Sequence, residues 1–286
     1  MERYGVGERI QAIDESFGQR RIGRLNGRGL WTLYEKEVRR FLKVWMQTVG
    51  APAMQALLFF LIFAIVLGGR GRVGEGIVFT QFLAPGLITM ALLQNAFQNT
   101  SSSLIISKVQ GTIVDVLMPP LSPGELTLGY VAGGVTRGLI VAAVLTAAFA
   151  LLPLDAIVFT HPWAIAFFSV TAAAMLSLVG ILTGIWAEKF DHVATITNFV
   201  VGPLTLLSGT FYSVERLKER MGEAADWLEP VLSVNPFFYV IDGVRYGFIG
   251  SSDSDIMTGV IVMLAIDAAL WAVVYRAFKT GWRVKA

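Results

Sequence analysis

Six stretches of the chain are almost entirely apolar, and polar or charged segments separate them. Each is close to or longer than the roughly 20 apolar residues that a helix needs to cross a bilayer. The pattern therefore predicts an all-α polytopic membrane protein with six transmembrane helices. The predicted spans are Val49 to Leu67, Ile77 to Ile106, Leu126 to Leu152, Trp163 to Ala187, Val193 to Tyr212 and Ile256 to Tyr275.

A different pattern precedes the first span. Between Gly29 and Trp45, apolar side chains recur on one helical face and charged side chains occupy the other. The apolar face holds Leu30, Trp31, Tyr34, Val38, Phe41, Leu42 and Trp45, and the polar face holds Glu35, Lys36, Arg39, Arg40 and Lys43. We expect an amphipathic helix in the plane of the cytoplasmic membrane surface, in contact with membrane lipids. A helix packed on a partner domain is the alternative.

Residues 1–28 mix charges with Gly and Gln and lack apolar periodicity, which predicts a flexible cytoplasmic arm. The predicted organisation is thus the arm over 1–28, an interface helix over 29–46 and a transmembrane domain over 47–286.

Composition and charge agree with this organisation. Hydrophobic residues make up 55% of the chain and charged residues 15%, against about 25% charged residues in soluble domains. Ten of the 23 Lys and Arg residues precede the first span, and basic residues are enriched in cytoplasmic segments. Both termini are therefore predicted to be cytoplasmic. The absence of cysteine excludes disulfides and thiolate chemistry.

Two spans carry polar side chains at helical spacing. The second span has Gln94, Asn95, Gln98, Asn99 and Ser102, and the fifth has Thr195, Asn198, Thr205 and Tyr212 around Gly202 and Pro203. Polar groups in hydrocarbon need partners or water, so such stripes either form hydrogen bonds between helices or line a transport pathway. The candidate pathway residues are Gln94, Asn95, Phe97, Asn99, Asn198, Phe199, Thr205 and Tyr212.

Two charged residues fall deep inside predicted spans, Arg137 in the third and Asp267 in the sixth. Each unpaired charge at such a depth costs at least about 2.5 kcal/mol. Their similar distances from the cytoplasmic side predict a buried structural ion pair, with a proton relay as the alternative.

No catalytic or metal site is predicted. His161 and His192 fall on opposite sides of the membrane, and Gly69 to Gly74 spells a GxGxxG in a short connection between two spans, where a dinucleotide-binding fold has no room.

Three motifs occur in a fixed order along the chain. Lys108-Val-Gln-Gly-Thr-Ile-Val-Asp-Val-Leu-Met-Pro-Pro lies between the second and third spans, and Leu207-Ser-Gly-Thr-Phe-Tyr-Ser213 ends the fifth. Asn235-Pro-Phe-Phe-Tyr239 precedes the last span, followed by Asp242 and Gly243-Val-Arg-Tyr-Gly247. Together with the order of the six spans, these motifs resemble the permease subunit of ABC-2 type exporters, the family of bacterial drug, nodulation-factor and polysaccharide export permeases.

The resemblance implies an exporter that moves an amphipathic or lipid-like substrate across the bacterial inner membrane. It implies a homodimer of this chain with two copies of a separate ABC ATPase. That partner binds ATP and Mg, so this chain itself binds no cofactor and no nucleic acid. Short helices that re-enter the outer leaflet are implied before the last span. The ATPase-coupling residues that it implies are Lys108, Val109, Gln110, Thr112, Asp115 and Val116.

Two other function classes are alternatives to an exporter permease. A membrane-embedded lipid-processing enzyme requires acidic or histidine clusters at a membrane face, and Asp191 with His192 provides one pair. An ion-coupled secondary transporter requires inverted repeats and several carboxylates inside the membrane, and the spans supply one deep acid, Asp267.

Overall fold

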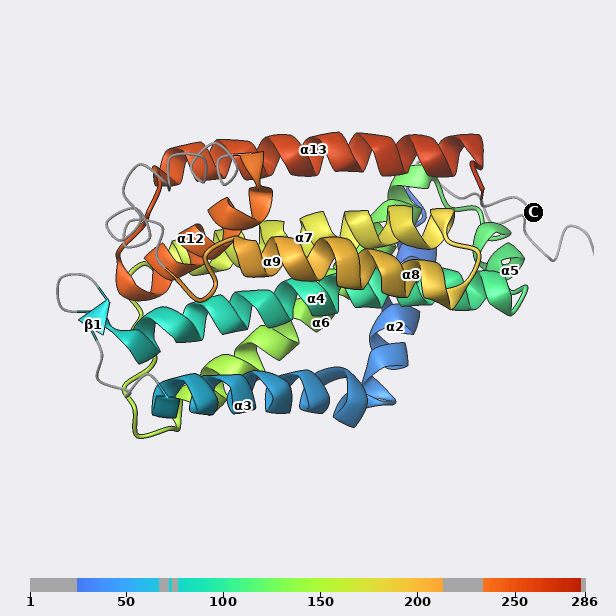
Figure 1. Ribbon diagram of the computed structural model, residues 1–286. Helices are drawn as coiled ribbons and strands as arrows, with labels where there is room; N and C mark the ends of the chain where they lie inside the picture. Colours follow the sequence, from blue (N-terminus) through green and yellow to red (C-terminus); the bar gives the residue numbers. More distant parts are fainter. Residues whose placement is uncertain (1–24, 67–71, 74–76, 213–233, 284–286) are drawn as a thin grey trace, which may run out of the picture.

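The computed structural model describes residues 25–66, 72–73, 77–212 and 234–283. Long helices lie side by side in a bundle, and α2 (Gly27–Leu42) runs across one end of it (Figure 1). Two very short antiparallel strands, β1 (Arg72–Val73) and β2 (Ile77–Val78), lie at the opposite end. The expected all-α polytopic architecture is confirmed.

Five described helices are long and apolar enough to cross a membrane: Met46–Val66, Pro123–Ala150, Pro162–Trp186, Phe190–Leu207 and Ile256–Thr280. They comprise η1 (Met46–Gly50) with α3 (Ala51–Val66), α6 (Pro123–Ala150), α7 (Pro162–Trp186), the composite of α8 (Phe190–Ile196), η2 (Thr197–Val201) and α9 (Gly202–Leu207), and α13 (Ile256–Thr280). The predicted second span is the 31-residue helix α4 (Phe79–Val109). It is absent from the five because its polar stripe lowers its hydropathy, so the six-span count stays a prediction.

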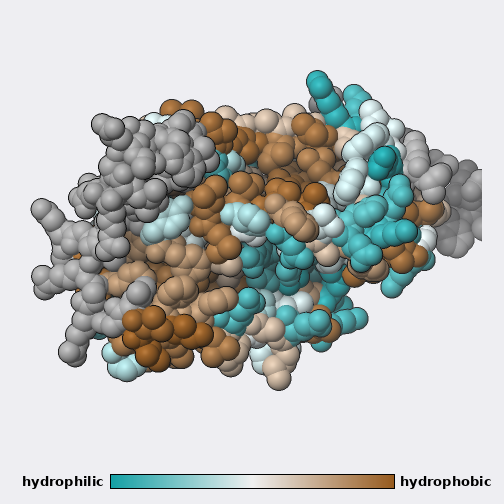
Figure 2. Space-filling model, in the orientation of Figure 1, coloured by the Kyte–Doolittle hydropathy of each residue, from teal (hydrophilic) through white to brown (hydrophobic). Residues whose placement is uncertain are grey.

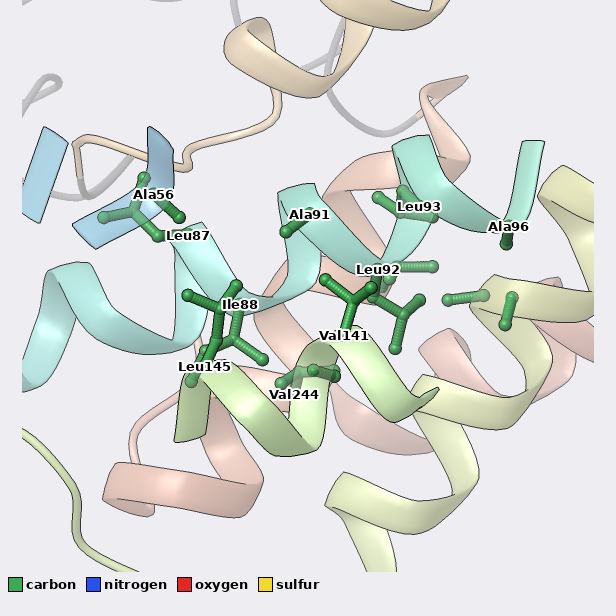
Figure 3. Packing of buried hydrophobic residues seen from close by; sticks show 14 of the residues in the cluster. Ala56, Leu87, Ile88, Ala91, Leu92, Leu93, Ala96, Val141, Leu145 and Val244 are labelled. Atoms are coloured by element: carbon green, nitrogen blue, oxygen red, sulfur yellow. The ribbon is translucent and has the colours of Figure 1, made fainter. Parts of the chain in front are cut away.

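The helix α4 occupies the centre of the bundle and packs against α3, α6, α7 and α12 (Pro236–Ile249). Leu87, Leu92 and Leu93 of α4 are buried among side chains of the neighbouring helices. Figure 3 shows this core, in which Ala56 of α3, Val141 and Leu145 of α6 and Val244 of α12 surround the α4 residues. Burial of most of the α4 surface explains how a helix with so many polar residues fits inside the bundle.

Two π-helical turns each precede a proline. The turn η1 ends at Gly50 and is followed by Ala51 and Pro52, and η2 ends at Val201 and is followed by Gly202 and Pro203. Proline has no N–H for the carbonyl four residues earlier, and widening the preceding turn accommodates this loss. A π-helical turn therefore interrupts the fifth span just before Gly202 and Pro203.

Polar residues are concentrated at one end of the bundle. The elements predicted to be cytoplasmic, α2, the short α5 (Ile113–Leu117), the start of α8 and the end of α13, lie together at one end (Figure 1). Polar residues gather there, whereas apolar residues cover α3 and much of α13 (Figure 2). At the other end, Thr80 donates to the Leu154 carbonyl and Thr160 to the Phe248 carbonyl, which ties the connections there to α4 and α12.

Some expectations lie outside the described residues. These are the arm up to residue 24 and the segment 213–233, which includes part of the region expected to form re-entrant helices. Of that region the structure describes α12, which lies at the end of the bundle opposite α2.

Candidate functional site

A groove separates the amphipathic helix α2 from the segment that follows α4. Its cavity has a volume of about 510 Å³. The lining residues are Gly29, Thr32, Leu33 and Lys36 of α2, and Thr112, Asp115, Val116, Pro119 and Leu121 of the following segment. Three of the coupling residues expected from the sequence, Thr112, Asp115 and Val116, are thus brought together with α2 on one surface.

Local sequence signals explain the position of this groove. Gly111 adopts a φ of 71°, a left-handed conformation that glycine permits, and it ends α4 before α5 begins. Ser122 and Glu125 form a capping box at the start of α6. The Asn26 side chain caps α2 by accepting a hydrogen bond from the Gly29 amide, and the Asn26 amide donates to Glu125. The two walls of the groove are therefore fixed to each other by their helix caps.

Lys108 has a different environment from the other expected coupling residues. Its ammonium donates hydrogen bonds of 2.6 Å to the carbonyls of Ile185 and Ala187, at the end of α7. Partial burial lowers the pKa of Lys108, although the nearby Glu188 carboxylate acts in the opposite direction. Val109 and Gln110 are exposed. Lys108 therefore joins α4 to α7, while its two neighbours remain accessible to a partner.

The buried face of α2 differs from the apolar face expected from the sequence. Leu33, Glu37 and Phe41 are buried, whereas Trp31 and Trp45 are exposed. The apolar face was expected to enter the lipid, and the bundle buries a neighbouring stripe of α2 with a carboxylate at its centre. Sequence reasoning missed Glu37, although its position four residues from both Leu33 and Phe41 was a usable signal.

Glu37 is fully buried and lies at the centre of a polar network between α2 and α4. Ser103 donates to its carboxylate over 2.6 Å, and Arg40 donates over 3.0 Å. Arg40 also donates to the backbone carbonyl and the side-chain oxygen of Asn99 and to Ser102. Close contact with α6 is possible because Gly133 lies opposite Glu37, where an added Cβ would come within 2.7 Å of the Glu37 Cβ.

A second cation, Arg137, binds the polar stripe of α4 at Asn95, one helical turn from Asn99. Arg137 of α6 donates to Asn95 over 2.9 Å and to Gln98 over 3.5 Å. The predicted pair between Arg137 and Asp267 is not formed, and in the described part of the chain one Asp267 carboxylate oxygen lacks a hydrogen-bond partner. Similar depth was the basis of that prediction, but Arg137 faces α4, whereas Asp267 belongs to α13. Arg137 is therefore bound by hydrogen bonds to two amides and not by an ion pair with Asp267.

The candidate pathway residues fall into two groups. Asn95, Phe97 and Asn99 are buried within the protomer, and Gln94 is half-buried in a narrow cleft between α3 and α4. On the fifth span, Asn198 and Phe199 are exposed, Thr205 is buried and hydrogen-bonded to the Val201 carbonyl, and Tyr212 donates to the Leu207 carbonyl. Buried and exposed residues thus occur on both stripes.

Polar residues are nevertheless visible at the surface between α3 and the α8 to α9 segment (Figure 2). Gln98 and Asn198 are exposed, and Gln94 is partly so.

Among the described residues, no group of three or more His, Asp or Glu side chains is arranged to hold a metal ion.

Comparison with known proteins identifies the family of the chain. The model of the ABC-2 type transporter family matches residues 28–249, which include α2, α5 and α12. The chain belongs to the ABC-2 type transporter family. This ABC-2 chain is 35% identical over 253 residues to the inner membrane transport permease YadH of Escherichia coli strain K12, covering 86% of this chain and 94% of the relative.

More distant ABC-2 relatives are also similar to this chain. Nodulation protein J of Neorhizobium galegae is 24% identical over 243 residues, covering 82% of this chain and 85% of the relative. The corresponding protein of Rhizobium leguminosarum bv. viciae is 25% identical over 238 residues. The chain is therefore a transmembrane ABC transporter subunit and a multi-pass inner membrane protein.

The Glu37 network leads to a stability prediction. Glu37→Gln removes the charge from hydrogen bonds to Arg40 and Ser103, so we expect it to lower the free energy of unfolding by about 1.5–3 kcal/mol. The matched control is Glu35→Gln, which removes an exposed ion pair with Arg39 on the same helix and should cost less than about 1 kcal/mol. Denaturant unfolding of the detergent-solubilised chain measures both, and equal losses would contradict the central role of Glu37.

Proposed function

We propose that this chain is the permease subunit of an ATP-driven exporter. In this proposal two copies form the pathway, two copies of a separate ABC ATPase bind ATP and Mg, and the cargo is an amphipathic or lipid-like molecule. The single observation that carries the proposal is the groove in which Thr112, Asp115 and Val116 lie opposite α2. Its position at one end of a membrane-spanning bundle suits contact with a cytoplasmic motor.

The charge pattern supports the orientation of the proposed exporter. Arg39, Lys43, Lys189 and Lys279 belong to elements at the same end of the bundle as the groove. Basic residues favour the cytoplasmic side, so this end is assigned to the cytoplasm and the end with α12 to the outside. Both termini then face the cytoplasm.

The chemistry of the groove suits an ATPase surface with an apolar side chain and flanking charges. Leu33, Val116 and Leu121 contribute apolar lining, while Lys36 and Asp115 contribute opposite charges. Arg40 is hydrogen-bonded to Asn99 of α4. A displacement of α2 is therefore transmitted to the central helix α4. In this mechanism the ATPase moves a rigid unit made of α2, α5 and the cytoplasmic half of α4.

The second copy is proposed to cover the face formed by α3 and the α8 to α9 segment. Met54, Leu58 and Ile62 of α3 are exposed and line an apolar depression of about 480 Å³. Phe199 is 79% exposed on the same composite span that carries Asn198. The exposed amide of Gln55 also lines this apolar depression, which suits a cargo with both an apolar and a polar part. Export out of the cytoplasm or inner leaflet is the proposed direction.

Site-specific photo-crosslinking tests the motor contact. A photoreactive phenylalanine analogue replacing Val116 in the full-length chain should capture, in native membranes, a protein whose peptides identify it as an ABC ATPase. The matched control replaces Phe159, an exposed aromatic residue in the connection before α7, and should capture no ATPase. Capture of the ATPase from position 159, or its absence from position 116, would refute the assigned docking surface.

Two asparagine variants separate pathway residues from packing residues. Asn99→Leu leaves Arg40 without its amide partner and should cost about 1–3 kcal/mol of stability. Asn198→Leu replaces an exposed side chain, so stability should change by less than about 0.5 kcal/mol, while stimulation of ATP hydrolysis by the amphipathic probe lysophosphatidylcholine should change. Assays use the reconstituted permease and ATPase complex. Unaltered stimulation in Asn198→Leu would remove this residue from the proposed pathway.

A further inference from the structure

The second and third sequence motifs meet at the end of the bundle opposite the groove. One is the turn Ser208 to Tyr212 after α9, and the other is α12 with the connection to α13. Neither motif takes part in the contacts of α2, α5 and α4 described above. Their meeting point lies at the outer end of the proposed pathway.

Arg245 of α12 makes the central contact between these segments. Its side chain is buried, with the residue 3% exposed, and it donates a hydrogen bond of 2.6 Å to the Gly209 carbonyl. The guanidinium lies 3.8 Å from the centroid of the Phe82 ring of α4, and Asp253 is 3.8 Å away on another side. One cation therefore joins α12, α4 and the end of the fifth span.

Asn235 holds the same turn from the start of α12. Its side-chain oxygen caps the helix by accepting from the Phe237 amide, while its nitrogen donates to Ser208 over 2.8 Å and to the Leu204 carbonyl over 3.4 Å. Asn235 and Arg245 thus bind the turn at two successive residues, Ser208 and Gly209.

The turn is also enclosed by α3 and α4. An added Cβ at Gly86 would lie 2.6 Å from the Thr210 carbonyl oxygen, so only glycine permits this approach of α4. The ring of Phe211 lies 5.1 Å from that of Phe63 in α3. Gly209 has a φ of 80°, which turns the backbone out of the helix, and its carbonyl accepts from Arg245.

Asp242 fixes the position of Asp253, the carboxylate near Arg245. Its carboxylate accepts hydrogen bonds from the amides of Asp253 and Ser254 over 2.7 and 2.9 Å, and from the Ser254 hydroxyl. The connection between α12 and α13 is thereby folded back toward Arg245. A buried cation with partners on several elements specifies one arrangement of those elements more than it adds stability.

We propose that Arg245 is a positioning residue that keeps the outer end of the fifth span closed over the transport pathway through its bond to the Gly209 carbonyl. This inference rests on the proposed function. During transport the Arg245 to Gly209 bond breaks, the turn moves away from α12 and α4, and the interior near Thr205 becomes accessible from outside. Restoring the bond closes the pathway again.

Cysteine labelling tests the proposal, and the natural chain has no cysteine to interfere. Thr205 is fully buried, so Thr205→Cys is expected to react slowly with a membrane-impermeant maleimide applied to ATP-depleted cells. Adding Arg245→Gln should raise the labelling rate at least fivefold in the same cells. Phe82→Leu, which removes the ring beside the guanidinium, should give a smaller increase in case Arg245→Gln fails to accumulate.

Controls separate a positioning role from general destabilisation. Arg283→Gln removes a cation at the opposite end of the bundle and should leave the labelling rate unchanged. In energised cells the Thr205→Cys chain with Arg245 intact should react faster than after ATP depletion, whereas the Arg245→Gln chain should lose this ATP dependence. Destabilisation alone would leave the ATP dependence in place.

A topology reporter distinguishes failure of this inference from failure of the proposed function. Ser252→Cys, in the exposed connection between α12 and α13, should react from outside whatever residue occupies position 245. If it reacts only after permeabilisation, the proposed orientation is wrong. If it reacts while labelling at Thr205→Cys stays slow in both the Arg245→Gln and Phe82→Leu chains, the role of Arg245 is overturned.

Discussion

The structure depends on one constraint: the amide and hydroxyl groups along α4 need hydrogen-bond partners inside an apolar bundle. Arg40 of α2 and Arg137 of α6 donate hydrogen bonds to the side-chain oxygens of Asn99 and Asn95. Each unsatisfied polar group in a membrane interior costs several kcal/mol, so the two arginines fix how α2 and α6 sit on α4. The central position of α4 and the attachment of the amphipathic helix follow from the same hydrogen bonds.

This constraint also connects the two ends of the molecule. At the groove end, Glu37 and Arg40 join α2 to α4, so a force on the α2 and α5 surface acts on the central helix. At the other end, α4 contributes Phe82 and Gly86 to the cluster around Arg245. A single helix thus contacts both the proposed motor surface and the proposed outer closure, which is a physical basis for coupling ATP hydrolysis to opening.

Hydrophobic periodicity was sufficient to predict the helices from the sequence but not how their faces meet. Helices lie at the positions of the predicted spans and of the amphipathic helix because length and apolar spacing are local properties. The pairing of Arg137 with Asp267 was wrong because depth along a helix does not specify the direction in which a side chain points. Glu37 was missed because a buried carboxylate requires a partner from another helix, and Ser103 is distant in sequence. The bond from Lys108 to the end of α7 depends in the same way on tertiary packing.

The central claim, that arginines from neighbouring helices bind the side-chain oxygens of the α4 asparagines, is tested most directly by a double-mutant cycle between Arg137 and Asn95. The single variants Arg137→Met and Asn95→Leu and the double variant would be compared by denaturant unfolding in detergent. We expect a favourable coupling energy of about 0.5–3 kcal/mol, as for residues in direct contact. Strict additivity of the two single effects would contradict the claim, because the two side chains would then act independently.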